Sequence, residues 1–458
     1  MIKKSIQKKQ QFLARGAGRE LLFFLLLSPF VLAACSGFTP GGQTTPTLTP
    51  QATNGTALPQ TPAPTQDATP AALPTPTVSG PRPLVIWLPP QFDPASTSPA
   101  GVKLRARLDA FQAANPGVKL EIRIKAVSGP GGLSDSLSTT SAAAPANLPG
   151  LVALSRSDLE TAALKGLVFP LDGLSKLADD PDWYPYARQL AYIQGSPYGL
   201  PFAGDAQLLM YRAAQVPVAP VDWPALFKYN LPLAFAAADP QATLTLLLYL
   251  SAGGTVKDSQ GRPALQADVL GRVLKLYSDG NKLGTFSNGV AQYQTDGQAA
   301  QAYHDQPPRA QWLVSWASRF LSELPADTTA MALPSLGTQP FTLATGWVWA
   351  LSEPDPLLRP TAVKLAEFLV NSDFLSQWTA SAGYLPTRPS ALAGWSNQSL
   401  KTILSPVVLA AQVRPANDLQ FILGPVLQDA TVQIFKQQAD PALVAQAAAE
   451  RLAVPPAK

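Results

Sequence analysis

Short apolar runs alternate with helical patterns from residue 84 onward. Residues 84–88 (LVIWL) are continuously apolar and stop at two prolines, and residues 151–154 (LVAL) form a second run of this kind. Residues 120–125 alternate apolar and charged side chains, which predicts a half-buried strand. Within residues 104–111 the apolar positions recur at helical spacing. This strand–helix–strand–helix order predicts an α/β domain with a mainly parallel sheet.

Residues 198–211 (YGLPFAGDAQLLMY) predict a strand that carries an unusual carboxylate. The even positions after the first proline hold no polar group, whereas the odd positions include Asp205, Gln207 and Tyr211. This period of two predicts a strand with one face in a core. Aspartate is depleted in strands and is almost never fully buried without a partner. We therefore expect Asp205 to leave the core face and point toward a polar partner.

The rest of the chain is predicted to be mainly helical. Asp222 and Asp239, each followed within two residues by proline, are typical of helix N-caps. Ser157 and Glu160 have the spacing of a capping box for an earlier helix. Residues 334–349 predict a return to extended structure. Helices are expected over residues 241–252, 265–279, 360–380 and 398–452.

The first residues of the chain have the pattern of an export signal. Six basic residues precede a run of a dozen mostly apolar residues, 21–32, which is short of the roughly 20 that a membrane span needs. Leu32-Ala33-Ala34-Cys35 follows and resembles the lipobox of bacterial lipoproteins. We expect residues 1–34 to be a lipoprotein signal peptide and Cys35 to be acylated; a signal-anchor helix is the alternative. The Thr/Pro-rich residues 36–83 cannot form a core and predict a disordered tether.

Composition narrows the classes of function. The whole chain carries a net charge of +4, of which residues 1–34 hold +5, so the remainder is close to −1 and offers no case for nucleic-acid binding. Cys35 is the only cysteine and His304 the only histidine, which disfavours a disulfide, a metal centre or a His-dependent triad. No phosphate-binding or dinucleotide-binding glycine motif is present. A pair of carboxylates for glycoside hydrolysis stays open, because the fold sets their spacing.

Aromatic residues are the stronger signal for a binding site. Trp and Tyr combine a flat apolar face with one hydrogen-bond donor, which suits a sugar with apolar C–H faces and many hydroxyls. Small-molecule sites combine such apolar walls with a few polar groups. Each aromatic taken alone also fits a core position. Those near expected loops or strand ends are Trp87, Tyr198, Trp223, Trp312, Trp316, Trp347, Trp349 and Tyr384.

Several stretches in order along residues 84–452 resemble the extracellular solute-binding proteins of ABC importers, family 1, which include the maltose-binding proteins. The stretches are LVIWLPP, LDAFQAANPGVKLEI, LKGLVFPLDGL, PFAGDAQLLMY, AQWLVSW, TGWVWALS and GYLPTR. Two family patterns are weaker here. The usual "PDV" strand start is Leu148-Pro149-Gly150-Leu151, without the Asp, and the usual helix before the ligand Trp is diluted to AQYQTDGQAAQAY.

The resemblance implies a type II periplasmic-binding-protein-like fold: two α/β lobes, each a mainly parallel sheet flanked by helices, joined by crossing strands. Lobe one would comprise residues 84–203 plus 338–372, and lobe two 204–337 plus 373–452. The resemblance implies ligand contacts by Trp87, Asp205, Trp312, Trp347, Tyr384 and Arg388; a salt bridge is an equal interpretation of Arg388. It implies no catalytic residue, no cofactor and no metal.

The resulting hypothesis is a lipid-anchored receptor on the extracytoplasmic face of a bacterial membrane. It would capture a sugar or similar polyol in the cleft between the lobes and deliver it to the permease subunits of an ABC importer, as a monomer and without chemistry. Two alternatives remain at this point. One is a surface-anchored glycoside hydrolase or other cell-wall enzyme, and the other is a sensor or interaction module of the same fold that serves no transporter.

Overall fold

The computed structural model describes residues 82–323 and 325–453. The expected signal peptide, Cys35 and nearly all of the tether lie outside these residues. The described strands are β1 (Leu84–Leu88), β2 (Leu120–Ile124), β3 (Leu151–Ser155), β4 (Tyr192–Ile193), β5 (Ser196–Pro197), β6 (Gly199–Arg212), β7 (Leu233–Ala234), β8 (Trp312–Trp316), β9 (Thr328–Met331), β10 (Thr342–Leu351) and β11 (Ala411–Val413).

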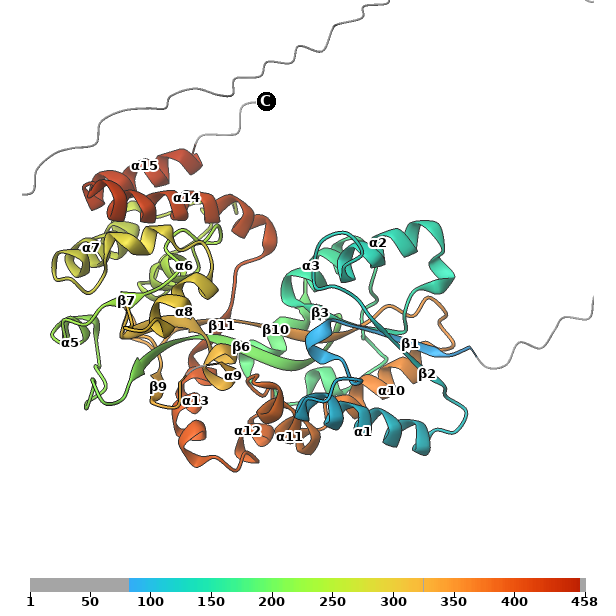
Figure 1. The fold of residues 1–458 in the computed structure, drawn as a ribbon. Coiled ribbons are helices and arrows are strands. Elements are labelled where there is room, and N and C mark those ends of the chain that lie inside the picture. The colour runs from blue at the N-terminus through green and yellow to red at the C-terminus, as the bar shows by residue number, and fades with distance from the viewer. Residues whose placement is uncertain (1–81, 324, 454–458) are drawn as a thin grey trace, which may run out of the picture. The chain divides into compact units, whose positions relative to one another are not determined.

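Nine of these strands form one mixed sheet that runs through both halves of the molecule (Figure 1). Its order is β2-β1-β3-β10-β6-β8-β7, with β9 paired to β6 and β11 paired to β10. Strands β1, β2 and β3 are parallel to one another, as predicted, whereas β10 is antiparallel to both β3 and β6. The α/β class and the two-lobed arrangement are therefore confirmed, with antiparallel strands where the lobes meet.

Helices cover both faces of the sheet. Among the described residues, none of the helices is long and apolar enough to cross a membrane. The helices are α1 (Pro99–Ala114), α2 (Leu133–Ala143), α3 (Arg156–Leu164), α4 (Pro185–Ala191), α5 (Trp223–Phe227), α6 (Thr243–Ser251), α7 (Ala267–Lys282), α8 (Asp296–His304), α9 (Ala317–Ser322), α10 (Arg359–Leu369), α11 (Ser372–Ala382), α12 (Pro389–Ala393), α13 (Gln398–Ala410), α14 (Asn417–Gln437) and α15 (Pro441–Ala453).

Two of the hydrophobic cores define the lobes. In the first lobe, the core beneath β1 and β3 is closed by α1, α10 and α11. In the second, α6, α7, α14 and α15 pack around Phe235 and Phe286. A third core extends beneath the crossing strands from Trp87 to Leu313 and is shared by both lobes. Helix α11 lies in the region that the sequence assigned to lobe two, yet its Trp378 packs against Phe92 of the first lobe.

The long strand β6 is the main connection between the lobes. Its first half pairs with β10, and its second half pairs with β8 and β9 of the second lobe. At the junction, Gly204 lies opposite Gly346 of β10. A Cβ atom on Gly204 would come within 2.1 Å of the Tyr186 hydroxyl. This tyrosine is fully buried and donates a hydrogen bond to the carbonyl of Pro386 at 3.2 Å. The junction therefore requires glycine for packing.

The close contact at Gly204 leads to a stability prediction. Gly204→Ala is expected to lower the free energy of unfolding by about 1–3 kcal/mol, because overpacked methyl groups displace their neighbours. Tyr186→Phe in the same chain should recover part of that loss, since it removes the atom nearest the new methyl. Urea titration of the single and double variants measures the coupling. Gly117→Ala is the control, since nothing lies within 4 Å of its added Cβ; an equal loss there would contradict the packing argument.

A candidate ligand site between the two lobes

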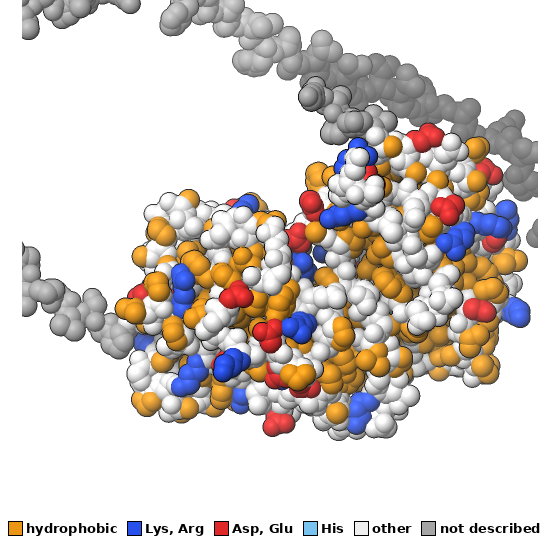
Figure 2. Space-filling view, turned by 180° about the vertical axis from the view of Figure 1, so that it is seen from behind, with side chains coloured by type: hydrophobic (Ala, Val, Ile, Leu, Met, Phe, Trp, Pro, Cys, Tyr) orange, Lys and Arg blue, Asp and Glu red, His pale blue; other side chains and the backbone are white. Residues whose placement is uncertain are grey.

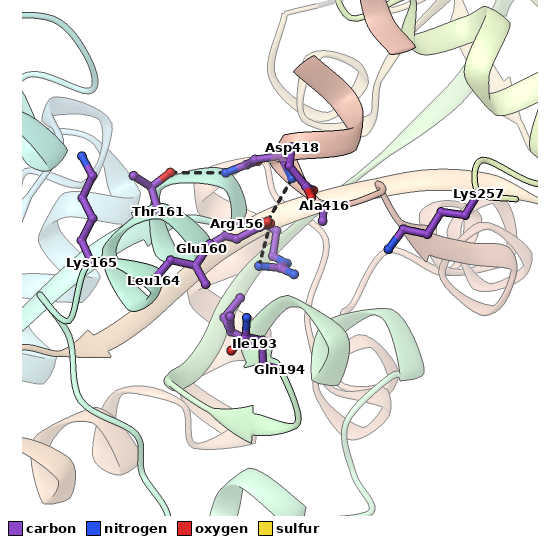
Figure 3. A pocket seen from close by; sticks show the side chains of 11 residues that line it. Arg156, Glu160, Thr161, Leu164, Lys165, Ile193, Gln194, Lys257, Ala416 and Asp418 are labelled. Carbon is purple, nitrogen blue, oxygen red and sulfur yellow. Dashed lines mark hydrogen bonds and ion pairs between the residues drawn. The ribbon is translucent and has the colours of Figure 1, made fainter. Parts of the chain in front are cut away.

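A groove of about 500 Å³ lies where α3 of the first lobe faces the start of α14 in the second. This volume is within the range of small-molecule sites. In Figure 3 the residues that line it come from several segments: α3, the turn between β4 and β5, the loop that carries Lys257, and the first residues of α14. Seen from behind, the molecule is hollowed between its two masses, with acidic and basic side chains at the edge of the hollow (Figure 2).

One face of α3 forms the first wall of the groove. Arg156, Glu160 and Leu164 are spaced four residues apart and so lie on the same side of the helix. The helix begins after Ser155, whose hydroxyl accepts a hydrogen bond from the Asp158 N–H at 3.2 Å. The capping box expected from Ser157 and Glu160 is therefore wrong. Ser155 provides the cap, and Glu160 is released for a longer-range contact.

Glu160 hydrogen-bonds across the groove to the second lobe. This residue is 7% exposed, and its Oε1 accepts the N–H of Asn417 at 3.0 Å. Asn417 is the first residue of α14, whose N-cap Ala416 offers no side-chain acceptor. The side-chain amide of Asn417 in turn donates to the Ser157 carbonyl at 2.8 Å and to the Thr161 hydroxyl at 3.3 Å. A helix of one lobe thus caps a helix of the other.

Charged groups continue from α3 toward the second lobe. Glu160 also forms an ion pair with Arg156, with Oε2 3.5 Å from Nη1. Burial lowers the pKa of Arg156 and of the partly buried Arg414, and the charge of Glu160 opposes the shift in both. Arg414 donates a hydrogen bond to the Gln241 side chain. The neighbouring Asp239 accepts from the Thr243 N–H at 3.1 Å and the Thr243 hydroxyl at 2.6 Å. The N-cap of α6 is Ala242, so the N-cap expected at Asp239 is wrong.

A second group of polar residues lies around the end of β8 and the start of α8. Asp296, at the start of α8, is partly buried, and this burial raises its pKa to about 6. The negative charge of Asp239 raises it further, whereas Arg319 and the Trp316 side chain favour the ionised form. Trp316 is partly exposed and pairs with Gln207, two residues beyond Asp205 on β6. This tryptophan therefore lies near the junction of the lobes.

Asp205, expected to face a polar partner, has its partner within the protein. It is 8% exposed, and its two oxygens accept the N–H of Ser318 at 3.0 Å and the Ser318 hydroxyl at 2.6 Å. The Ala206 N–H donates to the same carboxylate at 3.0 Å. Burial raises the pKa of Asp205 to about 7, while these hydrogen bonds lower it. The side chain thus ties β6 to α9.

Two of the expected aromatic contacts lie near Asp205 and are partly exposed. Trp347 on β10 pairs with Ala203 and with Ser155, the residue before α3. Tyr384 lies close enough to Asp205 for that charge to add to the effect of burial, which raises the tyrosine pKa to about 12. Phe92 joins them, with its ring centroid 5.2 Å from Trp347 and 5.6 Å from Tyr384. The exposed parts of Trp347 and Tyr384 provide an apolar surface beside the polar groups, and the buried Phe92 packs beneath them.

The other three expected contacts are buried. Trp87 and Trp312 are at most 2% exposed, in cores on either side of the junction. Trp312 is the first residue of β8 and pairs with Tyr211, so it lies far from Asp205. Arg388 is ion-paired with Asp180 and Asp182 at 3.4 and 3.2 Å. That contact agrees with the salt bridge considered from the sequence, and ligand contact by these three residues stays a prediction.

Several groove residues could not have been selected from the sequence. Asn417 lies more than 250 residues after Arg156 and Glu160 along the chain, and it meets them only through the crossing strands. The only available signal was the short polar stretch directly after the apolar run 151–154. Over the described ranges no cluster of three or more acidic, histidine or cysteine side chains could hold a metal ion. His304 ends α8 and packs edge-on against Tyr303.

The chain belongs to the bacterial extracellular solute-binding protein family, whose model matches residues 106–402. The members of this family are extracytoplasmic binding proteins, so the chain is a binding protein and not an enzyme. No curated protein sequence matches it.

Solved structures share the fold at low identity. Maltose-bound MalE3 of T. maritima is 19% identical with a TM-score of 0.61, over 81% of this chain and 98% of that chain. The sugar-binding protein MalE from the phytopathogen Xanthomonas citri is 16% identical with a TM-score of 0.68, over 81% and 96%. UgpB from Mycobacterium tuberculosis, in complex with glycerophosphocholine, is 15% identical with a TM-score of 0.61, over 81% and 98%.

The raised pKa of Asp205 predicts a pH-dependent stability. The native state keeps a proton on this carboxyl up to about pH 7, whereas an unfolded Asp loses it near pH 3.9. This contribution to the free energy of unfolding is complete below about pH 4 and is lost as the pH rises to 7, at up to about 1.4 kcal/mol per pH unit. Asp205→Asn removes the titrating carboxyl but can still form hydrogen bonds with Ser318 and Ala206. The free energy of unfolding of the variant, measured by chemical denaturation between pH 4 and 8, should therefore depend less on pH. Parallel profiles would contradict this assignment.

The contacts of Asn417 predict a role in the spacing of the lobes. Asn417→Ala removes two hydrogen bonds to α3, worth about 1 kcal/mol each, and should shift the equilibrium toward open molecules by up to about thirtyfold. Fluorophore pairs on cysteines at the exposed Val102 and Leu443, in a Cys35→Ser background, report the distance between the lobes. Asn397→Ala is the matched control, because Asn397 caps only its own helix at Leu400. An unchanged distance distribution for Asn417→Ala would show that the contact does not restrain the lobes.

Proposed function

We propose that the protein is a lipid-anchored receptor that captures a carbohydrate or related polyol between its lobes and delivers it to the permease of an ABC importer. The observation that carries this proposal is the groove itself, because its walls come from both lobes: α3 from one and the start of α14 from the other. A ligand that fills such a groove touches both lobes at once only when they are close together.

The groove explains how binding would produce a signal. A ligand shifts a conformational equilibrium by its difference in affinity for the two states. A solute held by both α3 and the Lys257 loop favours the closed state, and hinge closure is a common response of two-lobed binding proteins. The closed surface, absent from the empty receptor, is then the feature that a permease recognises.

The choice of a carbohydrate rests on the chemistry of the site and on similar structures. Partly exposed aromatic rings, Trp347, Tyr384 and Trp316, lie near groups that form hydrogen bonds. Rings of this kind stack on the apolar faces of sugars. Structures of similar fold have been solved with maltose and maltotetraose. Within this proposal, the contacting residues include Trp87, Asp205, Trp312, Trp347, Tyr384 and Arg388, together with Arg156 and Asp239 from the groove and its surroundings.

The anchoring part of the proposal rests on the sequence. Cys35 follows an apolar segment and a small-residue pair, as in bacterial lipoproteins. Several acyl chains on this cysteine would provide stable attachment to a membrane. Residues 36–83 would hold the two lobes away from the bilayer, within reach of a permease, and a monomer would suffice for delivery.

Calorimetric titration of the full chain with glucose, maltose, maltotetraose, glucose 6-phosphate and glucuronate tests the proposal. Binding of at least one sugar is expected, and Trp347→Phe should weaken it by about two- to tenfold through loss of ring contact. Trp395→Phe is the matched control, since Trp395 is buried away from the groove and bonded to Thr379. Folded protein that binds no sugar of this panel contradicts the proposed ligand class. Equal losses in the two variants would place the site elsewhere.

A further inference from the structure

The carboxylates at and near the groove are already engaged by the protein. Glu160 accepts from the N–H of Asn417 and is ion-paired with Arg156. Asp239 accepts from Gln241 and Thr243 at the start of α6, and Asp205 accepts from Ser318 and Ala206. A neutral polyol brings many O–H donors into a site, and these need acceptors. Of the carboxylates that line the groove, Glu160 is therefore paired with a cation, and the exposed Asp418 forms no ion pair with a described residue.

The cations of the groove are less fully engaged. Within the described part of the chain, Nε and Nη1 of Arg156 are buried and have no hydrogen-bond partner. The 3.5 Å contact with Glu160 is an ion pair and does not meet the geometry of a hydrogen bond. A buried donor without a partner is costly. The guanidinium therefore lies at the groove with donors still to be satisfied.

Two lysines add positive charge from opposite sides. Lys257 extends from a loop of the second lobe toward the groove, whereas Lys165, at the end of α3, lines its far edge and does not point toward Arg156 (Figure 3). Both are exposed, and neither forms an ion pair with any described residue. Of the two acidic residues that line the groove, Glu160 is engaged as above, and Asp418 accepts from the Leu419 N–H at 2.8 Å. The lining thus holds three cations and two carboxylates, and one of these carboxylates, Glu160, is already paired with Arg156.

We propose that the solute carries an oxyanion, a phosphate or carboxylate on a polyol, and that Arg156 binds this group. This inference rests on the proposed function and narrows its ligand class. A planar guanidinium can donate two parallel hydrogen bonds to such a group, and the group supplies only acceptors. Lys257 approaches the same charge from the second lobe, so that an anion draws the lobes together. The partly exposed rings beside the junction remain available for the carbon skeleton.

The test compares charged and neutral forms of one sugar on the full chain by calorimetric titration. Glucose 6-phosphate and glucuronate represent the two oxyanions, glucose the neutral form and inorganic phosphate the anion alone. We expect one of the charged sugars to bind at least tenfold more tightly than glucose and than phosphate, with an affinity that falls as salt is added. The stronger of the two charged sugars identifies the oxyanion.

Arg156→Gln should weaken binding of that charged sugar tenfold or more and leave glucose binding within threefold. Arg156→Lys keeps the charge but lacks the planar guanidinium, so its affinity for the charged sugar should lie between those of the unmodified protein and Arg156→Gln. The Lys variant also provides the test if the Gln variant does not fold. Arg123→Gln is the matched control, since Arg123 is an exposed arginine on β2 that pairs only with Glu121.

The outcomes separate this inference from the proposed function. Glucose that binds as tightly as both charged sugars overturns the inference and leaves the sugar receptor standing. Phosphate that binds as tightly as glucose 6-phosphate reduces the site to a general anion site and also overturns it. An equal loss of charged and neutral sugar in Arg156→Gln excludes Arg156 as the oxyanion contact. Folded protein without affinity for any of the sugars rejects the inference and the proposed function together.

Discussion

The antiparallel pairing of β6 with β10 is the constraint on which the rest of the structure depends. Residues of both strands lie in the cores of both lobes, so each lobe is built around the same two strands. Side chains at the junction must satisfy two packing environments at once. Gly204 and Gly346 face one another there, where a methyl group would meet Tyr186 or a backbone carbonyl. The junction sets where α3 and α14 meet and so where the groove lies.

Burial at this junction also decides how its charged groups are used. A carboxylate removed from water needs hydrogen-bond donors or a cation. Asp205 obtains its donors from α9, and Glu160 obtains its donor from α14 of the other lobe. Each of these hydrogen bonds joins two elements that are distant in sequence. The groups that join the lobes are therefore occupied by one another, and Arg156 retains two buried donors without a described partner.

Most of the fold could be predicted from local pattern, whereas most of the site could not. The alternation in residues 198–211 predicted β6, because one strand face follows from period two alone. The pattern could not show that α9 covers Asp205 on the other face. Ser157 and Glu160 fitted a local cap, but the partner of Glu160 is 257 residues further along the chain. Trp312 and Trp316 lie on one strand, and only its register with β6 places Trp316 nearer the junction.

The link between ligand and lobe spacing follows from the position of Arg156 and Glu160 on one helix face. Glu160 faces the cation of its own lobe and the N-terminus of α14 in the other. In the proposed binding mode, a ligand group on Arg156 would compete with Glu160 for the guanidinium, and the released carboxylate charge would act more fully on the N-terminus of α14. The second change would strengthen a contact between α3 and α14 that this structure already contains. In the proposed binding mode, recognition and lobe contact would be coupled through one turn of α3, without a signal that travels through either core.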